Sequence, residues 1–337
     1  MAKPPRQAAW VDQLGRWIRP AGQAASARKQ NRHLALGLQG GGALGAFTWG
    51  VLDRLLEEPN LPLGAVSGAS AGAVNGAVLV SHWTRGGPEA ARQALERLWR
   101  RLSESASIAR PGWLPGLGQS AGAVAFDVTL RLFSPYQLNP LDVNPLREVL
   151  AEEVDFRALA DRAAPELIVA ATRIRDGAPR LFRRGEVTLE AILASACLPL
   201  IHQAVEIENE VYWDGGYTLN PPLRALVEDT PPADLLVVQL NPATYDGLPK
   251  SAQEIGQRLN QIVFNRPLLE EWSALEEQAA DGRFRLHRLV IEPEALPPGG
   301  ALNLDWAFLS ALKEQGRTRA AAWLAERALV PDDAGQR

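Results

Sequence analysis

Two short apolar runs in this chain are each followed at once by a glycine-rich turn and then by a helical pattern. The first run, 33–38, precedes the glycines at 40–42, and the second, 65–67, precedes the segment 68–72. Strands buried on both faces appear in sequence as continuous apolar runs, and a helix directly behind each strand is typical of a parallel sheet. The pattern therefore predicts an α/β fold in which helices cover a mostly parallel sheet.

The same alternation continues through the rest of the chain. Strands are expected at 165–175, in a hairpin over 205–213, and at 235–240 and 284–291, and long helices at 250–280 and 305–328. Residues 86–145 interrupt this pattern as an insertion that includes the apolar loop 111–118. Such a loop can act as a lid or an interfacial contact, or it can simply cover the core. Since no clear linker divides the chain, we expect one domain over 33–330.

A serine lies between two glycines in the sequence GASAG at 68–72, directly after an expected strand and before an expected helix. This is the nucleophile-elbow pattern, in which the turn is so tight that larger side chains beside the serine would collide with neighbouring backbone. The hydroxyl then lies at the carboxyl edge of the sheet, near a helix N-terminus that favours negative charge. The pentapeptide alone is a weak signal, but its position makes Ser70 a candidate nucleophile.

A second glycine motif, GGGALG at 40–45, also follows a strand and begins a helix. Backbone N–H groups without side-chain cover are suited to an oxyanion hole. The same spacing matches Gly-x-Gly-x-x-Gly, which binds dinucleotides when an acidic residue at the end of the next strand holds the ribose. Here that strand, AVS at 65–67, has no carboxylate. The dinucleotide hypothesis is therefore disfavoured.

The sequence DGG at 214–216 follows the expected hairpin. An aspartate before a glycine pair commonly makes a turn, and that interpretation is sufficient for the motif taken alone. However, a serine hydroxyl is a poor nucleophile near neutral pH and needs a base. Asp214 is a candidate for that base, with no imidazole required.

The three motifs, in this order, resemble the patatin-like phospholipase family. The resemblance covers roughly 33–230 and includes ASACLP at 194–199, which is similar to the small-residue segment that precedes the family's catalytic aspartate. Each motif is weak alone, but together they are specific. The resemblance implies a three-layer α/β/α fold and hydrolysis of fatty-acyl esters of lipids, of the phospholipase A or lysophospholipase type.

The resemblance also implies roles for individual residues. Ser70 and Asp214 would form a catalytic dyad, and the oxyanion hole would come from the loop at Gly40, Gly41 and Gly42. We expect the amide of Ala71, the residue after the nucleophile, to add a further donor. One position departs from the family, because many members carry a basic residue where this chain has Leu44. That departure affects the expected contact with the lipid headgroup, not the backbone donors.

Two alternatives remain open from the sequence. The chain order of an α/β-hydrolase triad would be met by Ser70, Asp214 and His287. His287 lies in an expected strand, however, and Gln39 occupies the place before the glycines where that fold normally has a histidine. The other alternative is a non-catalytic lipid-binding module on the same fold, which would have no need for an accessible serine beside a base.

Composition limits the partners and cofactors. The four histidines have no metal-ligand spacing, and the single cysteine, Cys197, permits no intramolecular disulfide. We therefore expect no metal or other cofactor. A net charge of −4 argues against a nucleic-acid partner for the body of the protein.

The first 32 residues differ from the rest in charge. They contain seven Lys and Arg but one Asp, and the apolar residues between Trp10 and Ile18 recur at helical spacing. This basic amphipathic arm can lie on an anionic membrane surface, or it can pack on the main domain. Because no secretory leader or spanning helix is apparent, we expect a cytoplasmic protein with a peripheral membrane contact and a lipid substrate.

Overall fold

The computed structural model describes residues 33–109, 133–245, 247–291 and 300–329. The predicted N-terminal arm, 1–32, and the apolar loop 111–118 lie outside these residues. The strands are β1 Leu34–Leu38, β2 Leu63–Gly68, β3 Glu166–Arg173, β4 Pro179–Phe182, β5 Val205–Ile207, β6 Glu210–Asp214, β7 Asp234–Gln239 and β8 Arg285–Val290.

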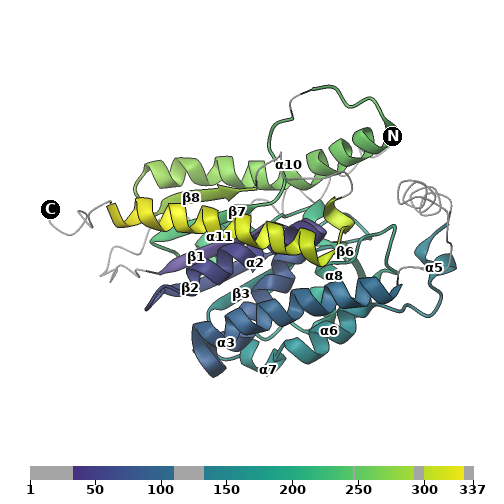
Figure 1. The fold of residues 1–337 in the computed structure, drawn as a ribbon, viewed down its shortest axis with the longest axis horizontal. Coiled ribbons are helices and arrows are strands. Elements are labelled where there is room, and N and C mark those ends of the chain that lie inside the picture. Colours follow the sequence, from purple (N-terminus) through teal and green to yellow (C-terminus); the bar gives the residue numbers. More distant parts are fainter. Residues whose placement is uncertain (1–32, 110–132, 246, 292–299, 330–337) are drawn as a thin grey trace, which may run out of the picture. The chain divides into compact units, whose positions relative to one another are not determined.

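These strands form one mixed sheet in the order β5-β6-β3-β2-β1-β7-β8, and β4 also pairs with β3. In Figure 1 the sheet is seen with β1, β2, β3, β6, β7 and β8 labelled. The strands from β3 to β8 along this order are parallel, and β4, β5 and β6 add antiparallel pairs at one side. The parallel centre and the hairpin around Asn209 confirm the sequence predictions. In the register, Leu38 is level with both Gly68 and Val238.

The described residues also form α-helices and short 3-10 turns. They are α2 Gly45–Leu55, α3 Ala71–Ala109, α5 Pro135–Leu138, α6 Pro145–Glu153, α7 Phe156–Leu159, α8 Leu189–Ser195, α9 Leu223–Asp229, α10 Ala252–Ala280 and α11 Trp306–Leu329, with short 3-10 turns η2 Gly42–Leu44, η3 Gly215–Tyr217 and η5 Gly300–Leu302. Helix α3 contains a break at Gly87, whose φ is 69°. The break divides α3 into a first half rich in small residues and a more polar second half.

Alternating residues of the central strand separate two hydrophobic cores. Leu34, Leu36 and Leu38 of β1 pack with residues of α2, α3 and α11 on one face of the sheet. Ala35 of the same strand packs with residues of α9 and α10 on the other face. Because side chains alternate between the two faces of a strand, both faces are covered by helices. This is the predicted three-layer α/β/α arrangement.

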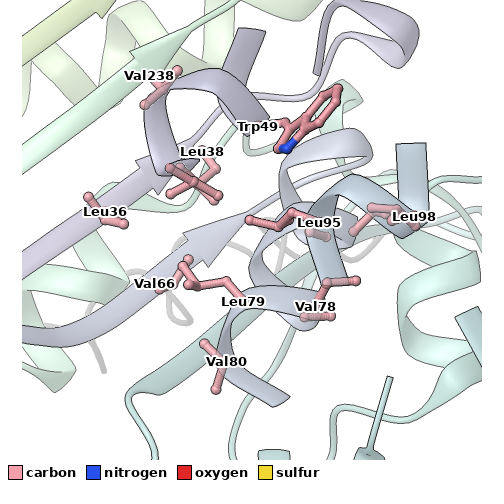
Figure 2. Close-up of a cluster of buried hydrophobic side chains, with 14 of the residues drawn as sticks. Leu36, Leu38, Trp49, Val66, Val78, Leu79, Val80, Leu95, Leu98 and Val238 are labelled. Atoms are coloured by element: carbon pink, nitrogen blue, oxygen red, sulfur yellow. The ribbon is translucent and has the colours of Figure 1, made fainter. Parts of the chain in front are cut away.

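The larger core joins β1, β2 and β7 to α2 and α3. Figure 2 shows its strand and helix side chains interleaved, among them Leu36, Leu38, Trp49, Val66, Val78, Leu79, Val80, Leu95, Leu98 and Val238. Burying an aliphatic side chain of this size stabilises a fold by about 1.5–3 kcal/mol. The core fixes the start of α3 against the ends of β1 and β2, and these segments carry two of the three sequence motifs.

Among the described residues, no helix is both long enough and apolar enough to span a bilayer.

Candidate active site

Ser70 lies in the turn between β2 and α3 with an unusual backbone conformation. Its φ is 53°, a left-handed value that is uncommon for a residue with a side chain. A Cβ on Gly68 would lie 2.5 Å from the Gly72 carbonyl carbon, and one on Gly72 would lie 2.0 Å from the Leu38 oxygen. Both flanking glycines are therefore required by close backbone contact, which is the physical basis of the elbow pattern.

A hydrogen bond from another segment holds this turn in place. The Ser70 amide donates to the Ser195 hydroxyl at 3.0 Å and to the Ser195 carbonyl at 3.1 Å. Ser195 ends α8, a helix capped at its start by the Thr188 side chain, which accepts the Ala191 amide. Sequence reasoning included Ser195 in a small-residue segment but did not identify this contact. The strained backbone of Ser70 is thus held by a buried partner far away in the chain.

Asp214 lies at the same edge of the sheet as Ser70. In the register, Gly68 pairs with Val169, and Ala171 pairs with Asp214. Strand β3 lies between β2 and β6 in the sheet. Ser70, just after β2, and Asp214, at the end of β6, therefore lie near the same end of β3, on its two sides. The carboxylate is fully buried, and its Oδ1 accepts the Gly216 amide at 2.7 Å.

The backbone around Asp214 is also fixed. The Thr172 hydroxyl donates to the Asp214 carbonyl at 2.8 Å, and the Asp214 amide donates to the Cys197 carbonyl at 2.9 Å. A Cβ on Gly215 would lie 2.1 Å from the Ala170 oxygen. The glycine after the aspartate therefore permits a close approach to β3. These contacts fix the backbone of Asp214 and thereby the position from which its carboxylate projects.

The buried position changes the acidity of this carboxyl group. Burial raises the pKa of Asp214 from 3.8 to about 7, although the Ser70 side chain and the Gly216 amide both act to lower it. The Oδ2 atom has no regular hydrogen bond to any described residue. The Ser70 hydroxyl is thus near enough to influence the carboxylate, without a hydrogen bond of regular geometry between them. A carboxylate with such a pKa is a much stronger base than an exposed one.

The glycine loop after β1 lies directly against the Ser70 turn. A Cβ on Gly40 would lie 2.7 Å from the Ser70 Cβ, and a Cβ on Gly45 would lie 2.7 Å from the Ala71 Cβ. Gly42 has a φ of 58°, and a Cβ there would lie 2.2 Å from the Ala301 carbonyl oxygen. Side chains are therefore excluded along this loop, and the three motifs converge on one place.

The backbone amides of the loop are not equivalent. The Gly40 amide donates to the Asn220 side-chain oxygen at 2.7 Å. An amide engaged in this way is not available to a substrate oxyanion, so the structure does not favour the predicted role of Gly40. The amides of Gly41, Gly42 and Ala71 have no acceptor among the described residues. Asn220 is buried and holds the loop, and the sequence analysis missed it.

A buried polar network extends from the loop to α10. The Gln39 side-chain oxygen accepts the amides of Leu240 at 2.7 Å and Asn241 at 3.0 Å. The Gln39 amide nitrogen donates to the Asn265 side chain at 3.0 Å. The Asn220 amide nitrogen donates to the Phe264 carbonyl at 3.0 Å. Because buried polar groups are costly unless paired, this network fixes the glycine loop relative to α10.

Asn75 of α3 makes a comparable link on the other side of the loop. Its amide donates to the carbonyls of Gly45 at 3.1 Å and Ala71 at 3.0 Å, and its oxygen accepts from the Trp99 indole at 3.1 Å. Asn75 thereby ties the start of α2 to the start of α3. No short-range pattern marks it in the sequence, because two of its three partners, Gly45 and Trp99, lie 30 and 24 residues away.

His287, the histidine of the alternative triad, is engaged away from the Ser70 turn. His287 lies in β8 level with Leu236, and its Nε2 lies 2.9 Å from the Asp234 carboxylate. Asp234 is the first residue of β7, whereas Ser70 follows the last residue of β2. His287 is therefore placed away from Asp214, and the structure contradicts the Ser70–Asp214–His287 triad. Nδ1 of His202 accepts the Leu198 amide at 3.3 Å within its own turn.

Cys197 is buried, and its thiol donates to the Gln203 carbonyl at 3.1 Å. Burial, with a smaller contribution from the charge of Asp214, raises the pKa of this thiol to about 12. A thiol with such a pKa is not ionised near neutral pH. No cluster of His, Cys, Asp and Glu suitable for a metal ion occurs in the described parts of the chain.

A comparison with protein-family models gives a match to the patatin-like phospholipase model over residues 36–227, more than half of the chain. This chain belongs to the patatin-like phospholipase family. Ser70, the glycine loop, Ser195 and Asp214 all lie within the matched residues. Membership confirms the resemblance noted in the sequence and places the chain among lipid acyl hydrolases.

Comparison with solved structures gives distant similarities. The structure of VipD from Legionella pneumophila shares 12% identity at a TM-score of 0.45, over 88% of this chain and 67% of VipD. ExoU in the ExoU–SpcU complex from the type III secretion system of Pseudomonas aeruginosa shares 15% identity at a TM-score of 0.42. That match covers 89% of this chain and 52% of ExoU, so the chain spans about half of ExoU's length. No match was found among curated proteins.

Proposed function

We propose that this protein is a serine hydrolase that cleaves fatty-acyl esters of lipids through a dyad of Ser70 and Asp214. The observation that carries the proposal is the buried Asp214 carboxylate, whose pKa burial raises to about 7 and which lies close enough to the Ser70 side chain to be affected by it. The strained backbone of Ser70 and the adjoining glycine loop support the same assignment.

In the first half of the reaction, the Ser70 oxygen attacks the ester carbonyl carbon while Asp214 accepts the hydroxyl proton. The carbonyl oxygen becomes an oxyanion, for which the amides of Gly41, Gly42 and Ala71 are the proposed donors. The bond to the alcohol or lysolipid then breaks, and Asp214 returns the proton to that leaving oxygen. The fatty acyl group stays on Ser70 as an ester.

In the second half, water attacks the acyl-enzyme and Asp214 takes a proton from it. Collapse of the second oxyanion breaks the bond to Ser70, and the proton passes to the serine oxygen as the fatty acid leaves. No step uses a metal or a cofactor. Removing one oxyanion donor from such a site typically lowers kcat by about a hundredfold or more.

Since the substrate is a lipid, the proposal includes peripheral contact with a membrane surface. The test is product analysis by mass spectrometry on a panel of phospholipids, lysophospholipids and neutral esters. Wild-type protein should release free fatty acid from at least one lipid class, and the Ser70→Ala variant should release none. If both proteins bind lipid vesicles and neither releases fatty acid, the non-catalytic lipid-binding alternative replaces this proposal.

A further inference from the structure

Two buried asparagines hold the glycine loop, residues 40–45, at its two ends. At the start of the loop, the Gly40 amide donates to the Asn220 side-chain oxygen at 2.7 Å. At its end, the Gly45 carbonyl accepts from the Asn75 side-chain nitrogen at 3.1 Å. Both asparagines are fully buried. Because a buried amide side chain is costly unless it is paired, each contact fixes the loop backbone at one point.

These two points are also where the loop packs on the Ser70 turn. A Cβ on Gly40 would lie 2.7 Å from the Ser70 Cβ, and a Cβ on Gly45 would lie 2.7 Å from the Ala71 Cβ. Asn75 also donates to the Ala71 carbonyl at 3.0 Å, so one side chain joins the end of the loop to the residue after the nucleophile. The separation between the loop and the Ser70 turn is therefore set at both ends.

Between its two ends the loop has free amides. The Leu44 amide donates to the Gly41 carbonyl at 3.2 Å within the turn η2, whereas the amides of Gly41 and Gly42 have no acceptor among the described residues. The direction of an N–H group follows from the backbone on either side of it. Fixing the backbone at residues 40 and 45 therefore sets the direction in which the free amides point.

The two asparagines anchor the loop to different helices. Asn75 belongs to α3, and its oxygen accepts from the Trp99 indole at 3.1 Å. The Asn220 nitrogen donates to the Phe264 carbonyl of α10 at 3.0 Å. Helices α3 and α10 pack on opposite faces of the sheet (Figure 1). Each amide side chain thus has both its donor and its acceptor engaged, which fixes its orientation.

We infer that Asn75 and Asn220 are positioning residues that align the oxyanion donors of this site. This inference rests on the proposed function, in which the amides of Gly41, Gly42 and Ala71 receive the oxyanion. Neither asparagine is assigned a contact with the reacting atoms. A neutral side chain suits this role, because it holds the backbone without placing a negative charge beside the oxyanion.

The first test is steady-state kinetics of Asn75→Ala and Asn220→Ala on an ester that the wild-type protein hydrolyses. Each substitution should lower kcat by about tenfold to a hundredfold, because a misplacement of about 1 Å has an effect of this size. The KM should change by less than about twofold, since the oxyanion donors act mainly in the transition state. The pH dependence of kcat/KM should keep its midpoint, because Asp214 remains the base.

The second test is hydrogen exchange of the substrate-free protein, followed by mass spectrometry of a peptide that covers residues 39–45. Exchange of this peptide should be at least about tenfold faster in each variant, since one end of the loop is released. The matched control is Asn144→Ala. The Asn144 side chain accepts the Leu146 amide at the start of α6, outside the glycine loop. That control should keep both wild-type kcat and wild-type exchange of the loop.

Circular dichroism checks that each variant is folded. A third variant, Asn220→Asp, is used if Asn220→Ala does not fold. It keeps an oxygen for the Gly40 amide, so the loop should exchange more slowly than in an alanine variant. Its kcat should still fall by at least about tenfold, because the new charge would oppose the oxyanion.

Wild-type kcat in a folded variant would overturn the role of the asparagine that it lacks. A higher KM with unchanged kcat would indicate substrate binding and would also overturn it. Unchanged exchange of the loop in both alanine variants would overturn the inference even in an active lipid hydrolase. If the wild-type protein releases no fatty acid, the proposed function fails, whereas the exchange measurement still decides whether the two asparagines hold the loop.

Discussion

Replacing Asp214 by asparagine should make the protein more stable and nearly inactive at the same time. The folded protein holds this carboxyl group fully buried, with its pKa raised from 3.8 to about 7. Asparagine keeps the oxygen that accepts the Gly216 amide and removes the charge. It also removes the base, so kcat should fall nearly as far as in Ser70→Ala.

The size of the stability gain follows from the pKa shift. A group whose pKa is higher in the folded state than in the unfolded state binds its proton more tightly when folded. Its ionisation therefore destabilises the fold as pH rises from the unfolded pKa to the folded pKa. A rise of about three pKa units corresponds to about 4 kcal/mol, present in full at pH 8. At pH 5 the carboxyl is still protonated in the fold, so the gain there is smaller by about 2–3 kcal/mol.

Urea denaturation of wild type and Asp214→Asn at pH 5 and pH 8 measures this difference. The matched control is Asp234→Asn, another buried aspartate on the same sheet. Burial acts to raise the pKa of Asp234, but hydrogen bonds from His287 and Arg285 and the charge of Arg327 outweigh it and hold the pKa below its usual range. Its ionised form stabilises the fold above the unfolded pKa, so Asp234→Asn should lower stability at both pH values.

The reasoning is refuted if Asp214→Asn has the same stability as wild type at pH 8, or if its gain does not grow with pH. Either result would mean that the Asp214 carboxylate is solvated in the folded protein. A loss of stability in both aspartate variants would show that the hydrogen bonds of Asp214 outweigh the burial of its charge.

Further predictions concern activity. The kcat/KM for ester hydrolysis should rise with pH to a plateau above about 7, because Asp214 must be ionised to accept a proton; a profile that is flat from pH 4 to 8 would contradict this. Ser195→Ala should lower kcat about tenfold with KM little changed, since one of two bonds to the Ser70 amide is lost; steady-state kinetics with an unchanged kcat would exclude the positioning role. Gly40→Ala should lower kcat by at least about tenfold, because the new Cβ would lie 2.7 Å from the Ser70 Cβ, and wild-type kcat would show that the loop can move. His287→Ala should keep most of the activity in the same assay. Near-complete loss of activity would instead support the Ser70–Asp214–His287 triad.

The sequence predicted the parts of the fold that are governed by local pattern. Apolar runs predicted the central strands, and the hairpin expected over 205–213 is formed by β5 and β6. The glycine motifs were visible for the same reason, since contacts such as that of Gly72 with the Leu38 oxygen leave no room for a side chain. Where the backbone is crowded, the sequence must carry glycine, and the glycines can be recognised.

The hydrogen bonds that support the site could not be predicted in this way. Gln39, Asn75 and Asn220 act on segments far from their own, and each looks like an ordinary polar residue among small or apolar neighbours. The engagement of the Gly40 amide depends on such a partner, so the sequence alone assigned it to the oxyanion hole. The role of His287 likewise required knowing that Asp234 begins the neighbouring strand.

Covalent labelling with a fluorophosphonate tests most directly whether Ser70 is an activated nucleophile. Wild-type protein should gain one adduct, mapped to Ser70 by peptide mass spectrometry, with a labelling rate that rises with pH around 7 and is nearly abolished in Asp214→Asn. A folded protein that is not labelled at Ser70, or that is labelled equally fast without Asp214, would contradict the proposed dyad.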